Sequence, residues 1–336
     1  MDKFGIGVIG CGDMGKSLAH NAQALEHVDV LRVSDLDEER SEKLAAEVDA
    51  EAHSDYHDLL SDDRIQGLLI ASPPFMHRQM TVDAANAGKH VFSEKPMAPT
   101  LEDCDTMIKA TRQNGVKLAI GLVCRFHATH SKVHEIVHSG DLGNPVCMIV
   151  HRLGEPWKLG SYLTHWRLQR DKSGGSLMEI NAHEIDFMRW TCGEVKSVYA
   201  AGGTYIQKKT DYPDVVVASL AFESGAVGLL HSSHASAIGG YGGRVDCEEG
   251  SIHFPHIWGG DAAIHVKTFE GREDRIPVSE IKVEEPVRHE IRVFVDAVLN
   301  DTTPPITGAD GRAAVEIALA AYQSVDHGKP VELPLS

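Results

Sequence analysis

A glycine-rich hexapeptide near the N-terminus, GCGDMG at residues 10–15, is the feature that most limits the fold of this chain. It follows an apolar stretch at Phe4–Ile9 that predicts a strand, and it precedes a helical pattern. In such a loop Gly10 permits a tight turn, Gly12 lets the backbone approach a pyrophosphate, and Gly15 lets helix and strand pack closely. The alternative is a glycine turn that holds no ligand. The context favours a dinucleotide-binding Rossmann domain.

Short apolar runs and amphipathic stretches alternate over the first third of the chain, which is typical of a doubly wound parallel sheet. The further strands expected there are Val30–Ser34, Gly67–Ala71, His90–Phe92 and Lys117–Gly121. We therefore expect an α/β Rossmann domain at residues 1–122.

The remainder of the chain has a different pattern. A helix is expected at residues 173–191, followed by β-rich segments over 197–269 without helices between them, and by closing helices at 286–299 and 309–326. This predicts an α+β domain at residues 123–336 with a large open, mostly antiparallel sheet. A ligand cleft is expected between the two domains.

Composition excludes several classes of function. The formal net charge of −17 would repel nucleic acid and anionic membranes, so neither is an expected partner. No run of eighteen apolar residues and no signal-peptide pattern is found, which favours a cytoplasmic protein. The six cysteines are scattered without a C-x-x-C pair, so neither a zinc knuckle nor a disulfide framework is predicted.

Asp35 ends the second predicted strand, about 20 residues after the glycine loop, where an acid accepts hydrogen bonds from the ribose hydroxyls of NAD. The acidic run Asp37–Glu39 follows and would repel the 2′-phosphate of NADP, so NAD is favoured over NADP. One alternative is that Asp35 caps the next helix. Arg40 is also close enough in sequence to neutralise a phosphate.

Two more loops follow predicted strands of the Rossmann domain. The turn ASPPFMH at residues 71–77 lies at a strand end, where ligands bind in such sheets, or is simply a Pro-Pro turn with Ser72 as helix cap. The segment Ser93–Pro96 contains Lys95, a candidate functional group beside Glu94. The alternative for a single loop lysine is a solvated side chain.

Glu179 and His183 are four residues apart in the helix expected at 173–191, so we expect them to share a face, with Asp186 at its border. Histidine titrates near neutral pH and suits the removal of a hydroxyl proton, with Glu179 orienting the ring. The alternative is a buried helix with a satisfied histidine.

Together, these motifs resemble those of the Gfo/Idh/MocA oxidoreductase family, which includes inositol dehydrogenases and glucose–fructose oxidoreductase. The motifs that carry the resemblance are the glycine loop, Asp35, the Ser-Pro-Pro turn, Glu94-Lys95-Pro96, Arg125-Phe126, Trp166-Arg167, the segment from Gly174 through Glu179 and His183 to Asp186, and the closing segments 308–312 and 330–334. The likeness implies transfer of a hydride between nicotinamide and a secondary hydroxyl or ketone of a sugar, sugar derivative or inositol.

The resemblance also implies roles for individual residues. Lys95 would hydrogen-bond the reacting oxygen, and His183 would be the catalytic histidine. Glu179 departs from the family pattern, because relatives most often carry aspartate there and one methylene moves the carboxylate by on the order of 1 Å. Asn181 stands where glycine is frequent.

The predicted catalytic residues are Lys95, His183 and Glu179. The predicted cofactor contacts are Gly10, Gly12, Asp13, Met14, Gly15, Asp35, Ser72, Pro73, His77, Glu94 and Lys95. The predicted substrate contacts are Arg125, His165, Trp166, Arg167 and Asn181. The resemblance implies a homodimer or homotetramer formed through the β-rich half.

Two other functions stay open at this point. One is a glycoside hydrolase or lyase that retains NAD and uses transient oxidation. The other is a non-catalytic nucleotide-binding regulator, which the presence of both Lys95 and His183 argues against.

Four histidines, His127, His130, His134 and His138, are spaced to share one face of a predicted helix. A metal site is one interpretation, and a solvated or subunit-facing stripe is the other. No matching set of acids or cysteines is evident, so the second is favoured and no metal site is predicted.

Overall fold

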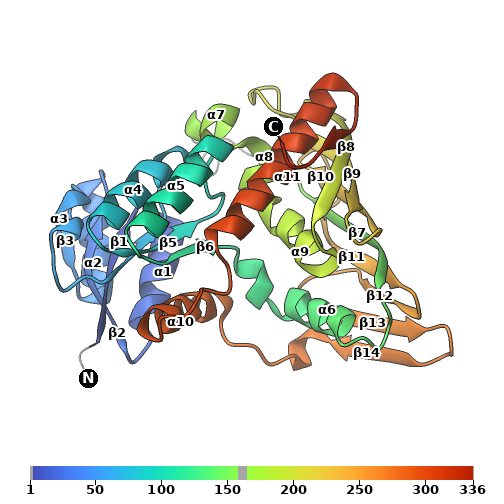
Figure 1. Cartoon of the computed structure of the whole chain (residues 1–336), viewed down its shortest axis with the longest axis horizontal. Helices are drawn as coiled ribbons and strands as arrows, with labels where there is room; N and C mark the ends of the chain where they lie inside the picture. Colours follow the sequence, from blue (N-terminus) through green and yellow to red (C-terminus); the bar gives the residue numbers. More distant parts are fainter. Residues whose placement is uncertain (1–2, 158–164, 336) are drawn as a thin grey trace. The chain divides into compact units, whose positions relative to one another are not determined.

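The computed structural model describes residues 3–157 and 165–335, and for His165 the backbone alone (Figure 1). The chain forms two compact units: Met1–Val123 with Glu284–Arg312, and Cys124–Val283 with Ala313–Ser336. We expected all of residues 123–336 in the second domain. The segment Glu284–Arg312 departs from this expectation, because it belongs to the first unit.

The first unit contains a six-stranded sheet with the order β3-β2-β1-β4-β5-β6, and all its strand pairs are parallel. Its strands are β1 Phe4–Ile9, β2 Val28–Ser34, β3 Glu51–His53, β4 Gly67–Ile70, β5 His90–Glu94 and β6 Leu118–Gly121. The predicted doubly wound sheet is confirmed. The strand order reverses between β1 and β4, so a ligand site is expected at their carboxyl ends.

Helices connect and cover this sheet. They are α1 Asp13–Gln23, α2 Glu38–Val48, α3 His57–Leu60, α4 Pro74–Asn86, α5 Leu101–Gln113 and α10 Pro286–Leu299. Ile291, Phe294 and Val295 of α10 lie in the same hydrophobic core as β1, and α10 packs beside α1 (Figure 1). This apolar face explains why the late segment belongs to the first unit.

The second unit contains a nine-stranded sheet with the order β14-β13-β12-β11-β7-β10-β9-β8-β15. Its strands are β7 Pro145–Leu153, β8 Val195–Gly203, β9 Val215–Phe222, β10 Val227–Ser233, β11 Gly240–Cys247, β12 Gly250–Phe254, β13 Ala263–Thr268, β14 Glu273–Pro277 and β15 Val331–Glu332. The β7–β10 pair is parallel and the other pairs are antiparallel, which confirms the predicted sheet type.

The helical elements outside the Rossmann sheet are η1 Val123–Phe126, α6 Ala128–His138, η2 His165–Leu168, α7 Arg170–Ser173, α8 Gly175–Glu179, α9 Ala182–Cys192, η3 Val278–Glu280 and α11 Gly308–His327. Helix α9 packs on β7 and β10 and covers one face of the large sheet. Among the helices that the structure describes, none is both long enough and apolar enough to cross a membrane.

The continuous helix expected at residues 173–191 is wrong. Three short helices occupy that region, with breaks at Gly174 and at Ile180–Asn181. Gly174 and Gly175 have φ angles of 78° and 72°, which a right-handed helix does not contain. The second break lies at the buried Asn181, whose side chain bonds to neighbouring groups described below.

Candidate active site

The glycine loop is held by backbone contacts that leave no room for side chains at two positions. Gly10 has a φ of +93°, and a Cβ there would lie 2.8 Å from the Ala71 carbonyl oxygen. A Cβ on Gly15 would lie 1.7 Å from the Gly10 carbonyl oxygen. Glycine is therefore required where the turn folds back and where α1 crosses it.

Gly12 has the opposite surroundings, because a Cβ built on it would meet nothing within 4 Å. It is also the N-cap of α1, and no side chain caps this helix end. The first backbone N–H groups of α1, including those of Asp13 and Met14, have no acceptor within the helix. Unsatisfied N–H groups and the positive end of a helix dipole fit a pyrophosphate at this place.

Asp35 connects the end of β2 to this loop. Its Oδ2 accepts a hydrogen bond from the Cys11 backbone N–H at 2.7 Å, and its Oδ1 accepts one from the Asp37 N–H at 2.9 Å. The cap of α2 is Asp37, so the alternative in which Asp35 caps that helix is wrong. Arg40 is engaged with Asp37 at 3.2 Å. The Asp35 carboxylate thus lies beside the predicted phosphate loop, as ribose recognition requires.

The turn after β4 begins α4. The N-cap of α4 is Pro73 and its first residue is Pro74, so Ser72 does not cap the helix. Instead the Ser72 hydroxyl lies 3.1 Å from the Met80 sulfur. The Ala71 N–H donates to the Ile9 carbonyl at 2.8 Å, which keeps this turn next to the glycine loop.

His77 is fully buried and connects two loops of the first unit. Its Nε2 lies 2.8 Å from the Ser72 carbonyl oxygen. Its Nδ1 lies 3.1 Å from the carbonyl oxygen of Pro96 and 3.3 Å from that of Met97. The ring therefore holds the turn after β4 against the segment that follows Lys95.

Lys95 follows the buried Glu94 at the carboxyl end of β5 and is itself half-buried. Its backbone N–H donates to Glu94 Oε2 at 3.1 Å. In the sheet register Glu94 pairs with Gly121, and a Cβ on Gly121 would lie 2.9 Å from Glu94 Oε1. The carboxylate of Glu94 thus fixes the lysine backbone rather than projecting into solvent.

The predicted pair in the second unit is divided between two helices. Glu179 ends α8, whereas His183 lies in the first turn of α9, so the shared helix face that we expected does not exist. Glu179 is 5% exposed and accepts a hydrogen bond from Arg167 Nε at 2.9 Å. The Arg167 guanidinium also stacks over the Trp166 ring at 4.3 Å. The Glu179 carboxylate therefore fixes the position of the Arg167 guanidinium.

Two predicted substrate contacts are engaged within the second unit. Arg125 makes a bidentate pair with the buried Asp186, at 2.8 Å and 2.6 Å. Asn181 is fully buried, donates to Glu184 Oε2 at 2.8 Å and accepts from the Ser232 hydroxyl at 2.6 Å. These contacts hold the first turns of α9 in place. The side chain of His165, a further predicted contact, lies outside the described residues.

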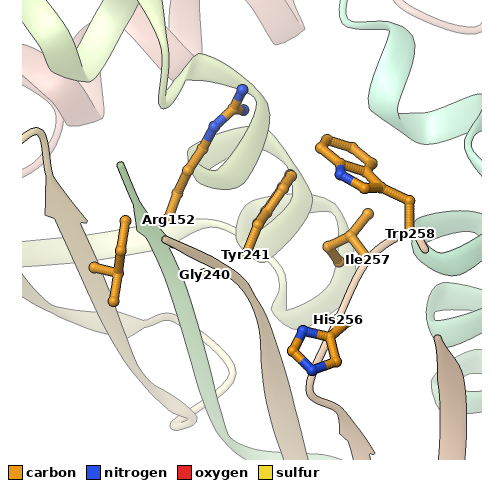
Figure 2. A pocket seen from close by; sticks show the side chains of 7 residues that line it. Arg152, Gly240, Tyr241, His256, Ile257 and Trp258 are labelled. Atoms are coloured by element: carbon orange, nitrogen blue, oxygen red, sulfur yellow. The ribbon is translucent and has the colours of Figure 1, made fainter. Parts of the chain in front are cut away.

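Sequence reasoning missed a pocket in the second unit, of about 320 Å³. Its lining residues are Arg152, Leu153, Gly240, Tyr241, His256, Ile257 and Trp258 (Figure 2). The Tyr241 ring lies between the Arg152 guanidinium, at 4.9 Å, and the Trp258 ring, at 5.1 Å (Figure 2). An aromatic wall with a cation suits a polyhydroxylated ring. Trp258 in a Pro- and Gly-containing loop after a strand was the only signal in the sequence.

Arg152 joins this pocket to the first turn of α9. Its Nη1 donates to Glu184 Oε1 at 2.9 Å, and Glu184 directly follows His183 in the chain. The Tyr241 hydroxyl lies 2.9 Å from His130 Nε2. Burial raises the pKa of Tyr241 well above 10 and lowers the pKa of His130 to about 3, so both groups are neutral at physiological pH.

The histidine stripe of α6 has varied surroundings. His130 is buried against Phe187, with 4.6 Å between ring centroids, and His134 stacks on Trp190 at 3.5 Å. His138 is exposed. In the part of the chain that the structure describes, no three His, Cys, Asp or Glu side chains are grouped to hold a metal ion.

Comparison with known families gives matches over most of the chain. A model described as "Oxidoreductase family, NAD-binding Rossmann fold" matches residues 4–122. A second, described as "GFO/IDH/MocA C-terminal domain", matches residues 130–253.

Curated relatives match along nearly their full length. An uncharacterized oxidoreductase of Bacillus subtilis is 31% identical, with 97% of this chain and 96% of that protein covered. Myo-inositol 2-dehydrogenase of Thermotoga maritima is 28% identical, with 98% of each covered. Among solved structures, a levoglucosan dehydrogenase in complex with NADH and levoglucosan has a TM-score of 0.88 at 24% identity, over 99% of this chain and 100% of that one. The last likeness establishes the fold.

Proposed function

Since this chain belongs to the Gfo/Idh/MocA family of oxidoreductases, with an NAD-binding Rossmann fold in its first unit, we propose that it is an NAD-dependent dehydrogenase of sugars or inositols. It would oxidise a secondary hydroxyl group, or reduce the corresponding ketone. Its relatives include enzymes named myo-inositol 2-dehydrogenase and scyllo-inositol 2-dehydrogenase.

The observation that carries this proposal is the presence of both Lys95 and His183 in a chain that matches an inositol dehydrogenase over 98% of its length. A nucleotide-binding regulator has no need for a lysine at the end of β5 and a histidine in the first turn of α9. The open space at Gly12 and the carboxylate of Asp35 fit the pyrophosphate and the ribose of NAD.

Each residue would have a distinct part in the reaction. Bound NAD supplies the nicotinamide that accepts or donates the hydride. His183 takes the proton of the substrate hydroxyl as general base. The ammonium group of Lys95 stabilises the negative charge that develops on that oxygen. The Glu94 carboxylate and the His77 ring hold the loop from which Lys95 projects.

We propose that residues of the second unit bind the substrate. Trp166 and Arg167 remain proposed contacts, since both are half-buried and Glu179 fixes the guanidinium. We add Arg152 and Trp258, because their pocket is linked to the first turn of α9 through Glu184. A sugar or cyclitol ring would stack on Trp258, and its hydroxyl groups would accept hydrogen bonds from Arg152.

The test is to incubate the purified protein with NAD and a panel of inositols, free sugars, anhydrosugars and glycosides, and to follow NADH absorbance. One substrate class should give a rise. Lys95→Met should lower the rate by about a hundredfold or more, because one donor to a developing oxyanion is lost. Lys109→Met, an exposed lysine of the same unit, is the matched control and should keep the rate.

The same samples are titrated with NADH by fluorescence. Lys95→Met should still bind NADH, which separates loss of chemistry from loss of cofactor. Release of free sugar from a glycoside, without accumulation of NADH, would contradict the dehydrogenase and favour a hydrolase that retains NAD.

A further inference from the structure

A buried carboxyl group lies close to the lysine loop, and the proposed chemistry does not use it. Glu290 of α10 is 3% exposed, and neither of its carboxyl oxygens has a hydrogen-bond partner in the described part of the chain. Its helix neighbours Ile291 and Phe294 belong to the hydrophobic core. A carboxylate here would lose its hydration without replacement, so burial raises the pKa of Glu290 well above its usual value.

The second cause of this raised pKa is the negative charge of Glu94. Phe294, one turn further along α10 than Glu290, packs against Phe92 with 6.0 Å between ring centroids. Phe92 is two residues before Glu94 on β5, and residues two apart in a strand share a face. Glu290 and Glu94 therefore lie on the faces with which α10 and β5 pack against each other.

The other charge that acts on Glu290 is also negative. It comes from Glu285, the N-cap of α10 itself. Helix α1, which packs on α10 as well, contributes no charged group that acts on Glu290 among the described residues. Two ionised acids in such a place would repel each other strongly, and a proton on one of them removes that repulsion.

Glu94 connects this acid to Lys95. The Glu94 side chain is itself buried, at 6% exposed, and its Oε2 holds the Lys95 backbone N–H at 3.1 Å. Its Oε1 lies over Gly121, where a Cβ would come within 2.9 Å. An oxygen at this position that accepts a proton from a second acid would keep the carboxylate from rotating.

We propose that Glu290 is a neutral carboxylic acid in the folded protein and donates its proton as a hydrogen bond to the Glu94 carboxylate. Glu290 is then a positioning residue for Lys95, acting through Glu94. The positioning role rests on the proposed function, because it assumes that Lys95 takes part in the reaction. The protonation state does not, and it is measured without any substrate.

Infrared difference spectroscopy at neutral pH tests the protonation state. The wild type should show the carbonyl stretch of a protonated carboxyl group, and Glu290→Gln should lack it. Glu42→Gln, an exposed glutamate of α2, is the matched control and should keep the band. Identical carboxyl regions in the wild type and Glu290→Gln would overturn the proposal, whatever the enzyme catalyses.

Unfolding in urea at several pH values gives a second, independent measurement. Above pH 4.5, the ordinary pKa of a glutamate side chain, the unfolded chain releases this proton, whereas the folded chain keeps it. Relative to Glu290→Gln, the unfolding equilibrium constant of the wild type should therefore rise about tenfold per pH unit until the folded-state pKa is reached. Equal pH dependence of the two proteins would contradict a neutral Glu290.

Steady-state kinetics tests the positioning role. Glu290→Gln keeps a donor of nearly the same shape and should hold kcat within about twofold of the wild type. Glu290→Met removes the donor and should lower kcat by about tenfold to a hundredfold, with KM for NAD unchanged, because a small displacement of Lys95 is costly. A wild-type kcat in Glu290→Met, or equal losses in both variants, would overturn this role. A wild type without dehydrogenase activity would refute the proposed function and leave the infrared result standing.

Discussion

We propose that the choice between NAD and NADP depends on Asp35. Asp35→Ala should raise the Kd for NADH by about tenfold to a hundredfold, since hydrogen bonds to a charged acceptor contribute about 1.5–3 kcal/mol. The affinity for NADPH should change less, because the carboxylate that repels the 2′-phosphate is removed together with the ribose contacts. Fluorescence titration with both nucleotides measures the ratio.

Asp37→Ala is the control for this measurement. Asp37 accepts a hydrogen bond from the Arg40 N–H at 3.3 Å and caps α2, so its loss should weaken that helix and leave the NADH-to-NADPH ratio nearly unchanged. An equal shift of the ratio in both variants would mean that the acidic run as a whole, and not Asp35, discriminates between the nucleotides.

At the scale of elements, helix α6 gives the stability a dependence on pH. His130 is fully buried and burial lowers its pKa to about 3, against 6.5 for an ordinary histidine. Below pH 6.5 the unfolded chain binds a proton that the folded chain does not. The free energy of unfolding should therefore fall by about 1.4 kcal/mol per pH unit from this group as the pH decreases toward 3.

The comparison of His130→Gln with the wild type in urea unfolding checks this prediction. The variant should lose stability less steeply below pH 6.5, although it is less stable near neutral pH because the contact with Tyr241 is altered. His138→Gln, at the exposed end of the same helix, should keep the wild-type slope. Parallel slopes for all three proteins would assign the acid sensitivity to other groups.

The break between α8 and α9 gives a prediction about Asn181. Asn181→Ala leaves the buried Glu184 and the buried Ser232 hydroxyl each without one partner. Since each unsatisfied buried group costs about 1–3 kcal/mol, the variant should lose about 3 kcal/mol of stability. Urea unfolding measures the loss. Asn144→Ala removes an exposed amide of the same unit. It should lower the free energy of unfolding by less than about 1 kcal/mol, as is usual for substitutions at the surface.

Some elements of the fold could be predicted from a short stretch of sequence, and others depend on residues far away in the chain. Strand β1 and helix α1 could be predicted, because apolar periodicity and the glycine loop encode them within a short stretch. The three-residue edge strand β3, Glu51–His53, has no apolar run, and its position depends on pairing with β2 and packing against α2. The break at Asn181 depends on Ser232, 51 residues away, so helical periodicity alone gave one continuous helix.

At the scale of the whole molecule, the same distinction divides the candidate site. The nucleotide half was predictable, since its loop, Asp35 and Lys95 each follow a strand of one parallel sheet. The pocket of Arg152, Tyr241 and Trp258 was not, because its residues come from separate segments with no common spacing. The return of α10 to the first unit, which packs the helix of Glu290 against the strand of Glu94, is equally invisible before the chain is folded.

The outer face of the large sheet gives the last prediction. Tyr199, Val217 and Val227 are 48%, 39% and 50% exposed on the neighbouring strands β8, β9 and β10. Leu229 and Ile149 pair across the β10–β7 ladder on the same face. Such an apolar sheet face is favoured as an interface between two copies of the chain. We expect a dimer or tetramer in solution, and light scattering after size exclusion should detect it.

A charged double variant tests whether this face makes the interface. Val217→Lys with Val227→Lys places two ammonium groups on this face, and their desolvation on association should shift the protein to monomers. Leu299→Lys, at an exposed apolar position at the end of α10, is the matched control and should keep the wild-type mass. The two substituted positions lie on the same face of the sheet. In the register of β9 and β10, Val217 pairs with His231 and Val227 pairs with Ala221. A wild type that is monomeric throughout the concentration range, or a double variant of unchanged mass, would show that this face does not hold the copies together.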